Sequence, residues 1–303
     1  MTTDTPLGAG PASRRSAAGR RAALGAYAVA GYLLAMAALV YLAGFLADVG
    51  VPRGIDAAPS GPPGRAVAVD LLLLLAFAVQ HSVMARRGFK RRLQAVVPAA
   101  AERSTYVLAA AVTLGSLMWW WQPVGPTWWR LDGPARAAVL VGYGAGWVLA
   151  LAATFQVSHT ALFGLRQAWA AARRRGYRPP ELTRGRLHRH VRHPLMLGLL
   201  VVVWAAPTLT GGHLALAVVL SAHVGVGIAL EERDLLAAHG AAYRDYRSTT
   251  PALSAALVAV VAVAASAAST HATAPTRSAW ADPHRTVRSP LPSGGWRASS
   301  APR

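Results

Sequence analysis

The chain has 303 residues, of which 54% are hydrophobic and only 14% are charged, so it is too apolar for an ordinary soluble domain, in which about 25% are charged. Its formal net charge of +19 does not indicate nucleic-acid binding, because the basic residues lie in loops and tails rather than on one amphipathic face. The absence of cysteine excludes a disulfide framework, a thiol nucleophile and a thiolate metal site.

Apolar residues gather into blocks that reach or approach the length of a membrane span, since about 20 helical residues cross about 30 Å of hydrocarbon. The blocks are residues 22–47, 66–85, 106–121, 135–157, 194–210 and 213–230. The first block follows four arginines but is longer than the apolar core of a signal peptide, so we expect a retained helix. The sequence therefore predicts an all-α, polytopic membrane helix bundle of five to six apolar segments.

The connecting segments predict an orientation. Residues 1–21, 86–103 and 166–192 are rich in Lys and Arg, whereas residues 48–65 and 122–136 are poor in them. Because basic loops stay on the cytoplasmic side of a membrane, we expect the N-terminus and both basic loops to be cytoplasmic.

The domain boundaries follow from composition. We expect a disordered basic tail at residues 1–21, a membrane domain at residues 22–250, and an Ala-rich segment with a disordered basic tail at residues 251–303. Only Gly211 and Gly212 separate the last two apolar blocks, which therefore predict a tight helical hairpin. Such a hairpin returns the chain to the cytoplasm and places residues 189–193 beside the segment that follows the last block.

The stretch RHVRHPLMLG, residues 189–198, brings two cationic side chains to the start of an apolar block. Pro194 is favourable in the first turn of a helix, and the free N–H groups of that turn attract anions. Arg192 and His193 therefore indicate an anion site, with a purely topological positive flank as the alternative. Zinc is not expected at the neighbouring histidines, because the arginines would crowd a dication.

The stretch LEERDLLAAHGAAYRDYR follows the last apolar block. Carboxylates at the edge of hydrocarbon, such as Glu231 and Glu232, are costly unless they are paired or functional. Tyr243 and Tyr246 lie further along the same helix, and a solvated helix with local ion pairs is the alternative. Together with the preceding stretch, these residues predict a site with cations on one wall and carboxylates and tyrosines on the other. Such a site suits a zwitterionic, ribose-bearing ligand.

Two further polar pairs lie near the ends of predicted spans. Gln80 and His81 are functional candidates because polar residues inside a membrane are rare, although a hydrogen bond between helices would also explain them. His159 and Arg166 are seven residues apart, about two helical turns, so both can face one cavity. Alternatively, Arg166 is the first of the cytoplasmic arginines.

The stretches VRHPLMLG and EERDL with HGAAYRDYR resemble the C-terminal cofactor region of the isoprenylcysteine carboxyl methyltransferase-like membrane methyltransferases, a group that includes NnrU-like proteins. QHSVMARRGFK, ERSTYVL, HTALFGLRQAW and WAAPTLTGGHL are most similar to the branch of this group that methylates methanethiol to dimethyl sulfide. The resemblance covers residues 67–253. Ser158 and Ala161 depart from it, because that branch carries Asn and Asp at these positions.

The resemblance implies S-adenosyl-L-methionine as the cofactor, a small thiol as the substrate, and a bacterial-type inner membrane with the cofactor region, residues 184–250, and both termini on the cytoplasmic side. The implied cofactor-binding residues are Arg192, His193, Pro194, Gly198, Glu231, Glu232, Tyr243 and Tyr246. His159 would be the catalytic base and Arg166 would stabilise the thiolate, with Gln80 and His81 on the substrate side. Neither a metal nor nucleic acid is an expected partner. Two alternatives stay open: a non-catalytic NnrU-like membrane protein, and a sterol reductase-like oxidoreductase that uses NADPH.

Overall fold

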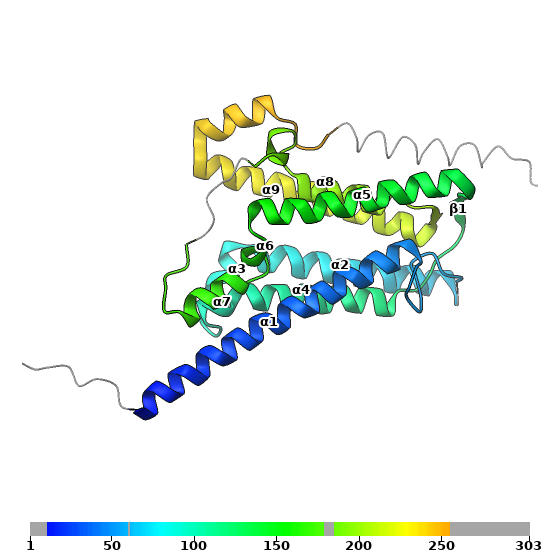
Figure 1. Cartoon of the computed structure of the whole chain (residues 1–303). Coiled ribbons are helices and arrows are strands. Elements are labelled where there is room, and N and C mark those ends of the chain that lie inside the picture. Colours follow the sequence, from blue (N-terminus) through cyan, green and yellow to red (C-terminus); the bar gives the residue numbers. More distant parts are fainter. Residues whose placement is uncertain (1–10, 60, 179–184, 255–303) are drawn as a thin grey trace, which may run out of the picture.

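The computed structural model of the protein describes residues 11–59, 61–178 and 185–254, which form a helical bundle with one small two-stranded sheet (Figure 1). The long helices are α1 (Pro11–Ala47), α2 (Pro63–Ala85), α4 (Ala99–Trp120), α5 (Gly133–Val157) and α9 (Gly211–Thr249). The short helices are α3 (Arg87–Leu93), α6 (His159–Leu162), α7 (Leu165–Ala172), the 3-10 turn η1 (Leu187–Arg189) and α8 (Pro194–Trp204). The strands β1 (Thr127–Arg130) and β2 (Thr208–Thr210) pair in antiparallel orientation.

Four of the described helices, α1, α2, α5 and α9, are long and apolar enough to cross a membrane. Their outward faces carry large apolar side chains, among them Leu33, Leu72 and Val148, which are 59%, 66% and 68% exposed. Exposure of this kind is unfavourable in water and suits contact with lipid. The protein is therefore an integral membrane protein, and the predicted all-α polytopic bundle is confirmed.

Small residues bring α8 against α5. A side chain at Gly198 in α8 would meet the backbone of Gly146 and Ala150 in α5 at 2.7 Å, so the two helices approach backbone to backbone. At 11 residues, α8 is too short to cross a bilayer as a helix, because each residue adds about 1.5 Å. It instead buries its apolar side chains in the core that α1, α2, α4 and α9 share.

The predicted hairpin of the last two apolar blocks is present, but its turn differs from the expectation. Helix α8 ends at Trp204, and the chain pairs with β1 through Thr208–Thr210 before α9 begins. Gly211 and Gly212 start α9, and their N–H groups donate to the carbonyls of Pro126 and Val124. Glycine suits these positions because the loop before β1 approaches their backbone closely.

The structure describes residues on both sides of the predicted membrane domain, residues 22–250. Residues 11–21 belong to α1 and are helical, where a disordered tail was expected. Residues 251 and 252, just beyond the predicted end of the membrane domain, contact the candidate site, as described below. Residues 255–303, with most of the Ala-rich segment and the predicted C-terminal tail, lie outside the described residues.

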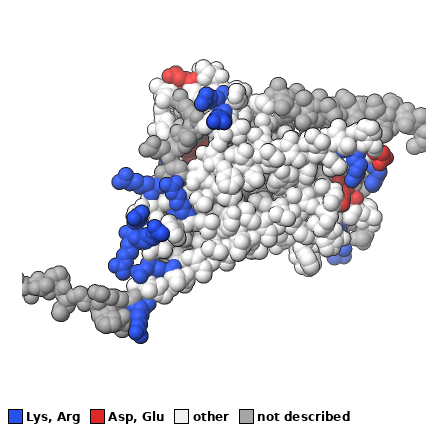
Figure 2. All heavy atoms as spheres, in the orientation of Figure 1, with Lys and Arg blue, Asp and Glu red and all other residues white. Residues whose placement is uncertain are grey.

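The two ends of the bundle differ in charge. Lys and Arg side chains gather at the end where α3 and α7 lie (Figure 2). At the opposite end, the carboxylate of Asp56 lies 2.8 Å from Nδ1 of His213 and accepts hydrogen bonds from Thr210. This buried pair fastens the loop after α1 to the start of α9.

Candidate functional site

A break in α9 assembles the candidate site. Gly240 has φ 51° and ψ −120°, a conformation that residues with a Cβ rarely adopt, so the helix changes direction there (Figure 1). The segment beyond it leads to Pro251 and Ala252, whose carbonyls accept the backbone N–H groups of Arg192 and His193 at 2.9 and 3.2 Å. The chain after α9 therefore lies against the start of α8. This agrees with the expected hairpin, which places residues 189–193 beside the segment that follows the last apolar block.

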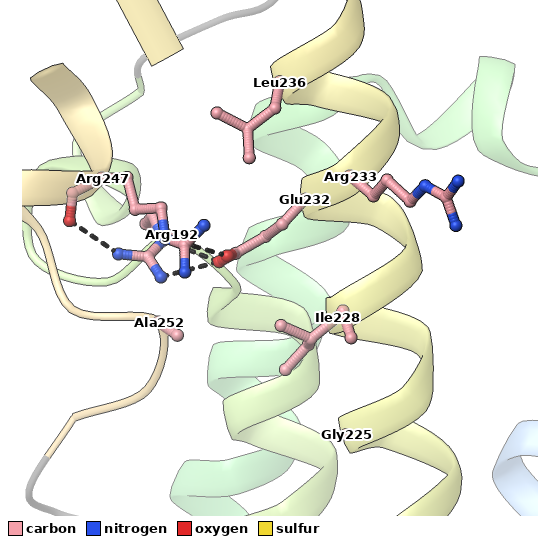
Figure 3. Close-up of a pocket in the computed structure, with 9 residues that line it drawn as sticks. Arg192, Gly225, Ile228, Glu232, Arg233, Leu236, Arg247 and Ala252 are labelled. Carbon is pink, nitrogen blue, oxygen red and sulfur yellow. Dashed lines mark hydrogen bonds and ion pairs between the residues drawn. The ribbon is translucent and has the colours of Figure 1, made fainter. Parts of the chain in front are cut away.

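An ion pair between α9 and the segment before α8 lies at the centre of the site. Nη2 and Nε of Arg192 lie 2.7 and 2.9 Å from Oε1 of Glu232, and both side chains are 9% exposed (Figure 3). Nη1 of Arg192 donates to the carbonyls of Arg247, at 3.0 Å, and Thr250. Nε of Arg247 lies 3.5 Å from the second oxygen of Glu232. Two arginines thus compensate the buried carboxylate, as a charge in a dry environment requires.

His193 lies beside two carboxylates. Its Nε2 is 3.2 Å from Oε1 of Glu232, and its Nδ1 is 3.5 Å from Oε2 of Glu231. Burial alone would lower the pKa of His193, but Glu231 and Glu232 outweigh burial and raise this pKa above its ordinary value. Burial and the neighbouring cation of His193 lower the pKa of His188. The imidazole of His193 thus favours its protonated form next to the carboxylates.

A cavity of about 400 Å³ opens beside this ion pair, within the range of small-molecule sites (Figure 3). Its lining residues are Arg192, Gly225, Ile228, Ala229, Glu232, Arg233, Leu236, Arg247 and Ala252. Charged groups line one part of the cavity, and aliphatic side chains such as Ile228 and Leu236 line another. This combination suits a ligand that has both a charged end and a flat apolar part.

The other predicted cofactor-binding residues lie around this cavity or apart from it. Tyr243 is buried, and its hydroxyl has no hydrogen-bond partner among the described residues. The hydroxyl of Tyr246 donates to the carbonyl of His188 at 2.6 Å. Pro194 opens α8 as predicted, whereas Gly198 packs against α5 and does not line the cavity.

The structure does not place His159 and Arg166 in one cavity. The prediction assumed two continuous helical turns, but His159 lies in α6 and Arg166 in α7, and Gly164, with φ 88°, separates the two helices. His159 stacks on Phe155, and its ring nitrogens lie 2.9 Å from Oγ1 of Thr154 and 3.2 Å from the hydroxyl of Tyr32. Arg166 is exposed, and neither residue lines the cavity beside Glu232.

Gln80 and His81 connect helices. The side-chain oxygen of Gln80 accepts a hydrogen bond from Thr113 of α4 at 3.1 Å. The ring of His81 lies within hydrogen-bond distance of the Tyr106 hydroxyl, and its centroid is 5.8 Å from that of His223 in α9. Both contacts fit the alternative of hydrogen bonding between helices, and neither residue lines the cavity beside Glu232.

Sequence reasoning missed three contributors to the site. Gly240 changes the direction of α9, and Arg247 supplies a second cation. The backbone carbonyls after Thr249 accept hydrogen bonds from Arg192 and His193. The glycine in AHGAAY was a readable signal, because a lone glycine in a helical pattern often marks a break. The hydrogen bonds to backbone carbonyls could not be predicted, because the pattern of side chains carries no signal for them.

Fold and site together define an integral membrane helix bundle with a charged pocket at its basic end. A family model described as NnrU protein matches residues 71–277, and the chain belongs to this family. A methanethiol S-methyltransferase of Mycobacterium tuberculosis is 47% identical over 222 residues, 73% of this chain and 91% of that protein. Methanethiol S-methyltransferase 2 of Bradyrhizobium diazoefficiens is 41% identical over 233 residues, 77% of this chain and 90% of that protein.

A more distant relative has a different name. Nurim of Sus scrofa is 32% identical over 180 residues, 56% of this chain and 68% of that protein. No solved structure matches the chain. The resemblance inferred from the separate motifs is thus confirmed by relatives that align over most of the chain.

Proposed function

We propose that this protein is a membrane methyltransferase that uses S-adenosyl-L-methionine to methylate methanethiol, forming dimethyl sulfide. The relatives named methanethiol S-methyltransferase support the reaction, because they align over about nine-tenths of their own length. The observation that carries the proposal is the cluster of Arg192, Glu232 and His193, of which Arg192 and Glu232 line a cavity of about 400 Å³. Buried ionisable groups in a membrane protein are costly and mark functional sites.

The residues of this cavity fit the proposed cofactor. Its carboxylate needs a cation, which Arg192 or Arg247 can supply, and its ribose hydroxyls and amino group need acceptors such as Glu232. Ile228 and Leu236 offer apolar surface to the adenine ring. The hydroxyl of Tyr243, buried without a partner among the described residues, is a further polar group available to a ligand. Glu231 and Tyr246 complete the proposed set through their contacts with His193 and His188.

When bound, the cofactor supplies an electrophilic methyl group. Its transfer would form a carbon–sulfur bond to the thiol as the donor's carbon–sulfur bond breaks, and the thiol proton would have to leave because the thiolate is the nucleophile. Positioning of the two sulfur atoms supplies much of the acceleration. We keep His159 as the proton acceptor and Arg166 as the stabilising cation. For this, Tyr32 must release Nε2 of His159, and Arg166 must turn from its exposed position.

We place the cofactor site on the cytoplasmic side. The concentration of Lys and Arg at the end of the bundle that carries α3 and α7 supports this orientation, since positive charge holds loops inside (Figure 2). Methanethiol is small and apolar, so it can reach a site in the bundle from the bilayer.

The test is the formation of labelled dimethyl sulfide. Membranes that contain the full chain would receive methanethiol and methyl-labelled S-adenosyl-L-methionine, and the headspace would be analysed by mass spectrometry. We expect labelled dimethyl sulfide well above the signal of empty membranes and of membranes with Glu232→Gln. Equal signals in all three preparations would contradict the proposed activity.

A second measurement separates the cofactor classes. A ligand that binds the folded state alone raises the melting temperature of the protein. We expect S-adenosyl-L-methionine to do so and NADPH not to. A shift with NADPH alone would favour the reductase, and no shift with either would favour a non-catalytic protein.

A further inference from the structure

A second cavity, of about 650 Å³, lies at the basic end of the bundle and has no part in the proposed reaction. Its walls come from α3, α4, the end of α5, α6 and α7. The residues that line it are Lys90, Gln94, Ala99, Ala100, Glu102, Arg103, Val157, Ser158, Ala161, Leu162, Gln167, Ala171, Arg175 and Tyr177. None of them lines the cavity beside Glu232.

Cations outnumber carboxylates in this second cavity. Among its described lining residues there are three cations, Lys90, Arg103 and Arg175, and one carboxylate, Glu102. The carboxylate is already bound, because it lies 3.6 Å from Nζ of Lys90 and accepts a hydrogen bond from Gln94 at 3.0 Å. Arg103 and Arg175 form no ion pair with a described residue. The cavity therefore has an uncompensated positive charge that favours an anion.

Arg103 is held in place for such an anion. Its Nε donates to the carbonyl of Leu162 at 2.6 Å, and its guanidinium carbon lies 4.9 Å from the centre of the Tyr106 ring. These contacts fix the side chain and leave its two terminal nitrogens without an acceptor among the described residues. A fixed guanidinium fork of this kind matches the paired oxygens of a phosphate group.

The cavity also offers a buried acceptor. Nε2 of Gln167 donates to the carbonyl of Ala161 at 3.1 Å, which leaves Oε1 of Gln167 buried without a partner among the described residues. A buried acceptor without a partner is costly, so a ligand that donates a hydrogen bond to it is favoured. A phosphate diester has no such donor, whereas a hydroxyl group has one. The side chains together therefore select a ligand that has both a phosphate and hydroxyl groups.

The position of the cavity at the end of α5 favours a lipid as the source of this chemistry. The cavity lies where α5, one of the helices able to cross the membrane, ends at Val157. Val157 itself lines the cavity and is 48% exposed. A headgroup in the cavity would thus have apolar surface beside it for its acyl chains, and basic pockets between membrane helices are known to hold anionic headgroups.

We propose that the cavity bounded by Arg103, Gln167 and Arg175 binds an anionic phospholipid with a hydroxyl-bearing headgroup, represented by phosphatidylglycerol. The phosphate lies between the two arginines, and a headgroup hydroxyl donates to Oε1 of Gln167. The bound lipid bridges α3, α4 and α7 and so stabilises the basic end of the bundle.

Native mass spectrometry of the full-length protein in mild detergent tests this proposal. The protein would be titrated separately with phosphatidylglycerol, phosphatidylcholine and glycerol 3-phosphate. We expect phosphatidylglycerol to be retained at least fivefold more than phosphatidylcholine, since a basic residue near an anionic lipid contributes about 1 kcal/mol. Equal retention of the two lipids would overturn the proposal. Retention of glycerol 3-phosphate without phosphatidylglycerol would assign the cavity to a free phosphate ester and would also overturn it.

A matched pair of variants locates the lipid. Arg175→Gln removes a cation from the cavity, whereas Arg173→Gln removes one that lies on the ring of Trp169, outside the cavity. Both arginines are exposed, so both variants are expected to fold. We expect only Arg175→Gln to weaken phosphatidylglycerol retention, by about fivefold. An equal loss in both variants would show a general surface charge effect and overturn the assignment. The thermal shift with S-adenosyl-L-methionine, expected to be unchanged in both, reports separately on the proposed methyltransferase site.

Discussion

Arg192 and Glu232 are 40 residues apart in the chain, yet Nη2 of the arginine lies 2.7 Å from Oε1 of the glutamate. The contact joins the segment before α8 to the middle of α9, so it closes the helical hairpin at its charged end. A buried carboxylate between two arginines cannot lose a partner without leaving an uncompensated charge. The pair thus links the stability of the hairpin to the shape of the proposed cofactor cavity.

Removing the charge of Glu232 tests this link. We expect Glu232→Gln to lower the free energy of unfolding by about 3 kcal/mol, because it leaves Arg192 buried without its partner. It should also weaken binding of S-adenosyl-L-methionine, measured by isothermal titration calorimetry in detergent. Asp234→Asn, an exposed carboxylate two residues along the same helix, is the matched control and should change neither quantity. Unchanged cofactor affinity in Glu232→Gln would remove this residue from the proposed site.

His193 makes the stability of the site depend on pH. Glu231 and Glu232 raise its pKa against the effect of burial, and Arg192, Arg247 and His188 are further charged or titratable groups nearby. The stabilisation from the protonated ring is fully present below its ordinary pKa of about 6.5 and is lost as pH rises through the higher folded-state value. We expect the melting temperature of the native protein to fall over this window. His193→Gln should remove most of that fall, and an identical pH profile in the variant would contradict the assignment.

The part of the site that depends on charged side chains and on the helical hairpin could be predicted from the sequence. Two apolar blocks with little between them have to return the chain, so Arg192 and Glu232 were expected to be neighbours, and they are. The hydrophobic blocks likewise located α2 and α5, because a membrane requires apolar residues in a continuous run.

Backbone geometry is what the pattern did not reveal. Helix α5 ends at Val157, and Ser158 has φ 139° although no glycine or proline marks this position. Beyond it the chain forms the separate short helices α6 and α7, so the seven-residue spacing of His159 and Arg166 does not place them on one helix face. Gly198 was assigned to the cofactor because it follows the Arg192 motif, but its contact is with the backbone of Gly146. A single sequence does not distinguish a glycine that is needed for helix packing from one that is needed for contact with a ligand.

A substitution at Gly198 distinguishes these two roles. An added Cβ would lie 2.7 Å from the backbone of Ala150 and Gly146, which cannot move as a flexible side chain can. We expect Gly198→Ala to cost about 1–3 kcal/mol of stability through overpacking. Gly142→Ala in α5, where nothing lies within 4 Å of an added Cβ, should be close to neutral. Chemical denaturation of the two variants measures the difference, and a stable Gly198→Ala variant with weak cofactor binding would restore the ligand role.

Gly240 offers a test of the break in α9. Its φ of 51° with ψ of −120° is strained for any residue with a Cβ, so Gly240→Ala should cost about 1–3 kcal/mol. Because the break leads the chain back to Arg192, the variant should also bind the cofactor more weakly. Gly227→Ala, in the straight part of α9 with open space around it, is the control. Thermal unfolding with and without S-adenosyl-L-methionine checks both effects, and equal behaviour of the two variants would show that the break is dispensable.

His159 is the residue whose proposed role departs most from its position. If it accepts the thiol proton, His159→Asn should lower turnover by about 10²-fold with the cofactor affinity intact, and the deficit should shrink as rising pH supplies more thiolate. Tyr32→Phe is the informative companion, because it frees Nε2 of the ring from the hydroxyl 3.2 Å away and should keep turnover at least at the native level. Labelled dimethyl sulfide per folded protein is the measurement for both. If His159→Asn lost thermal stability but turned over normally, its hydrogen bond to Thr154 and its stacking on Phe155 would define a structural residue, and the base would have to be sought nearer Glu232.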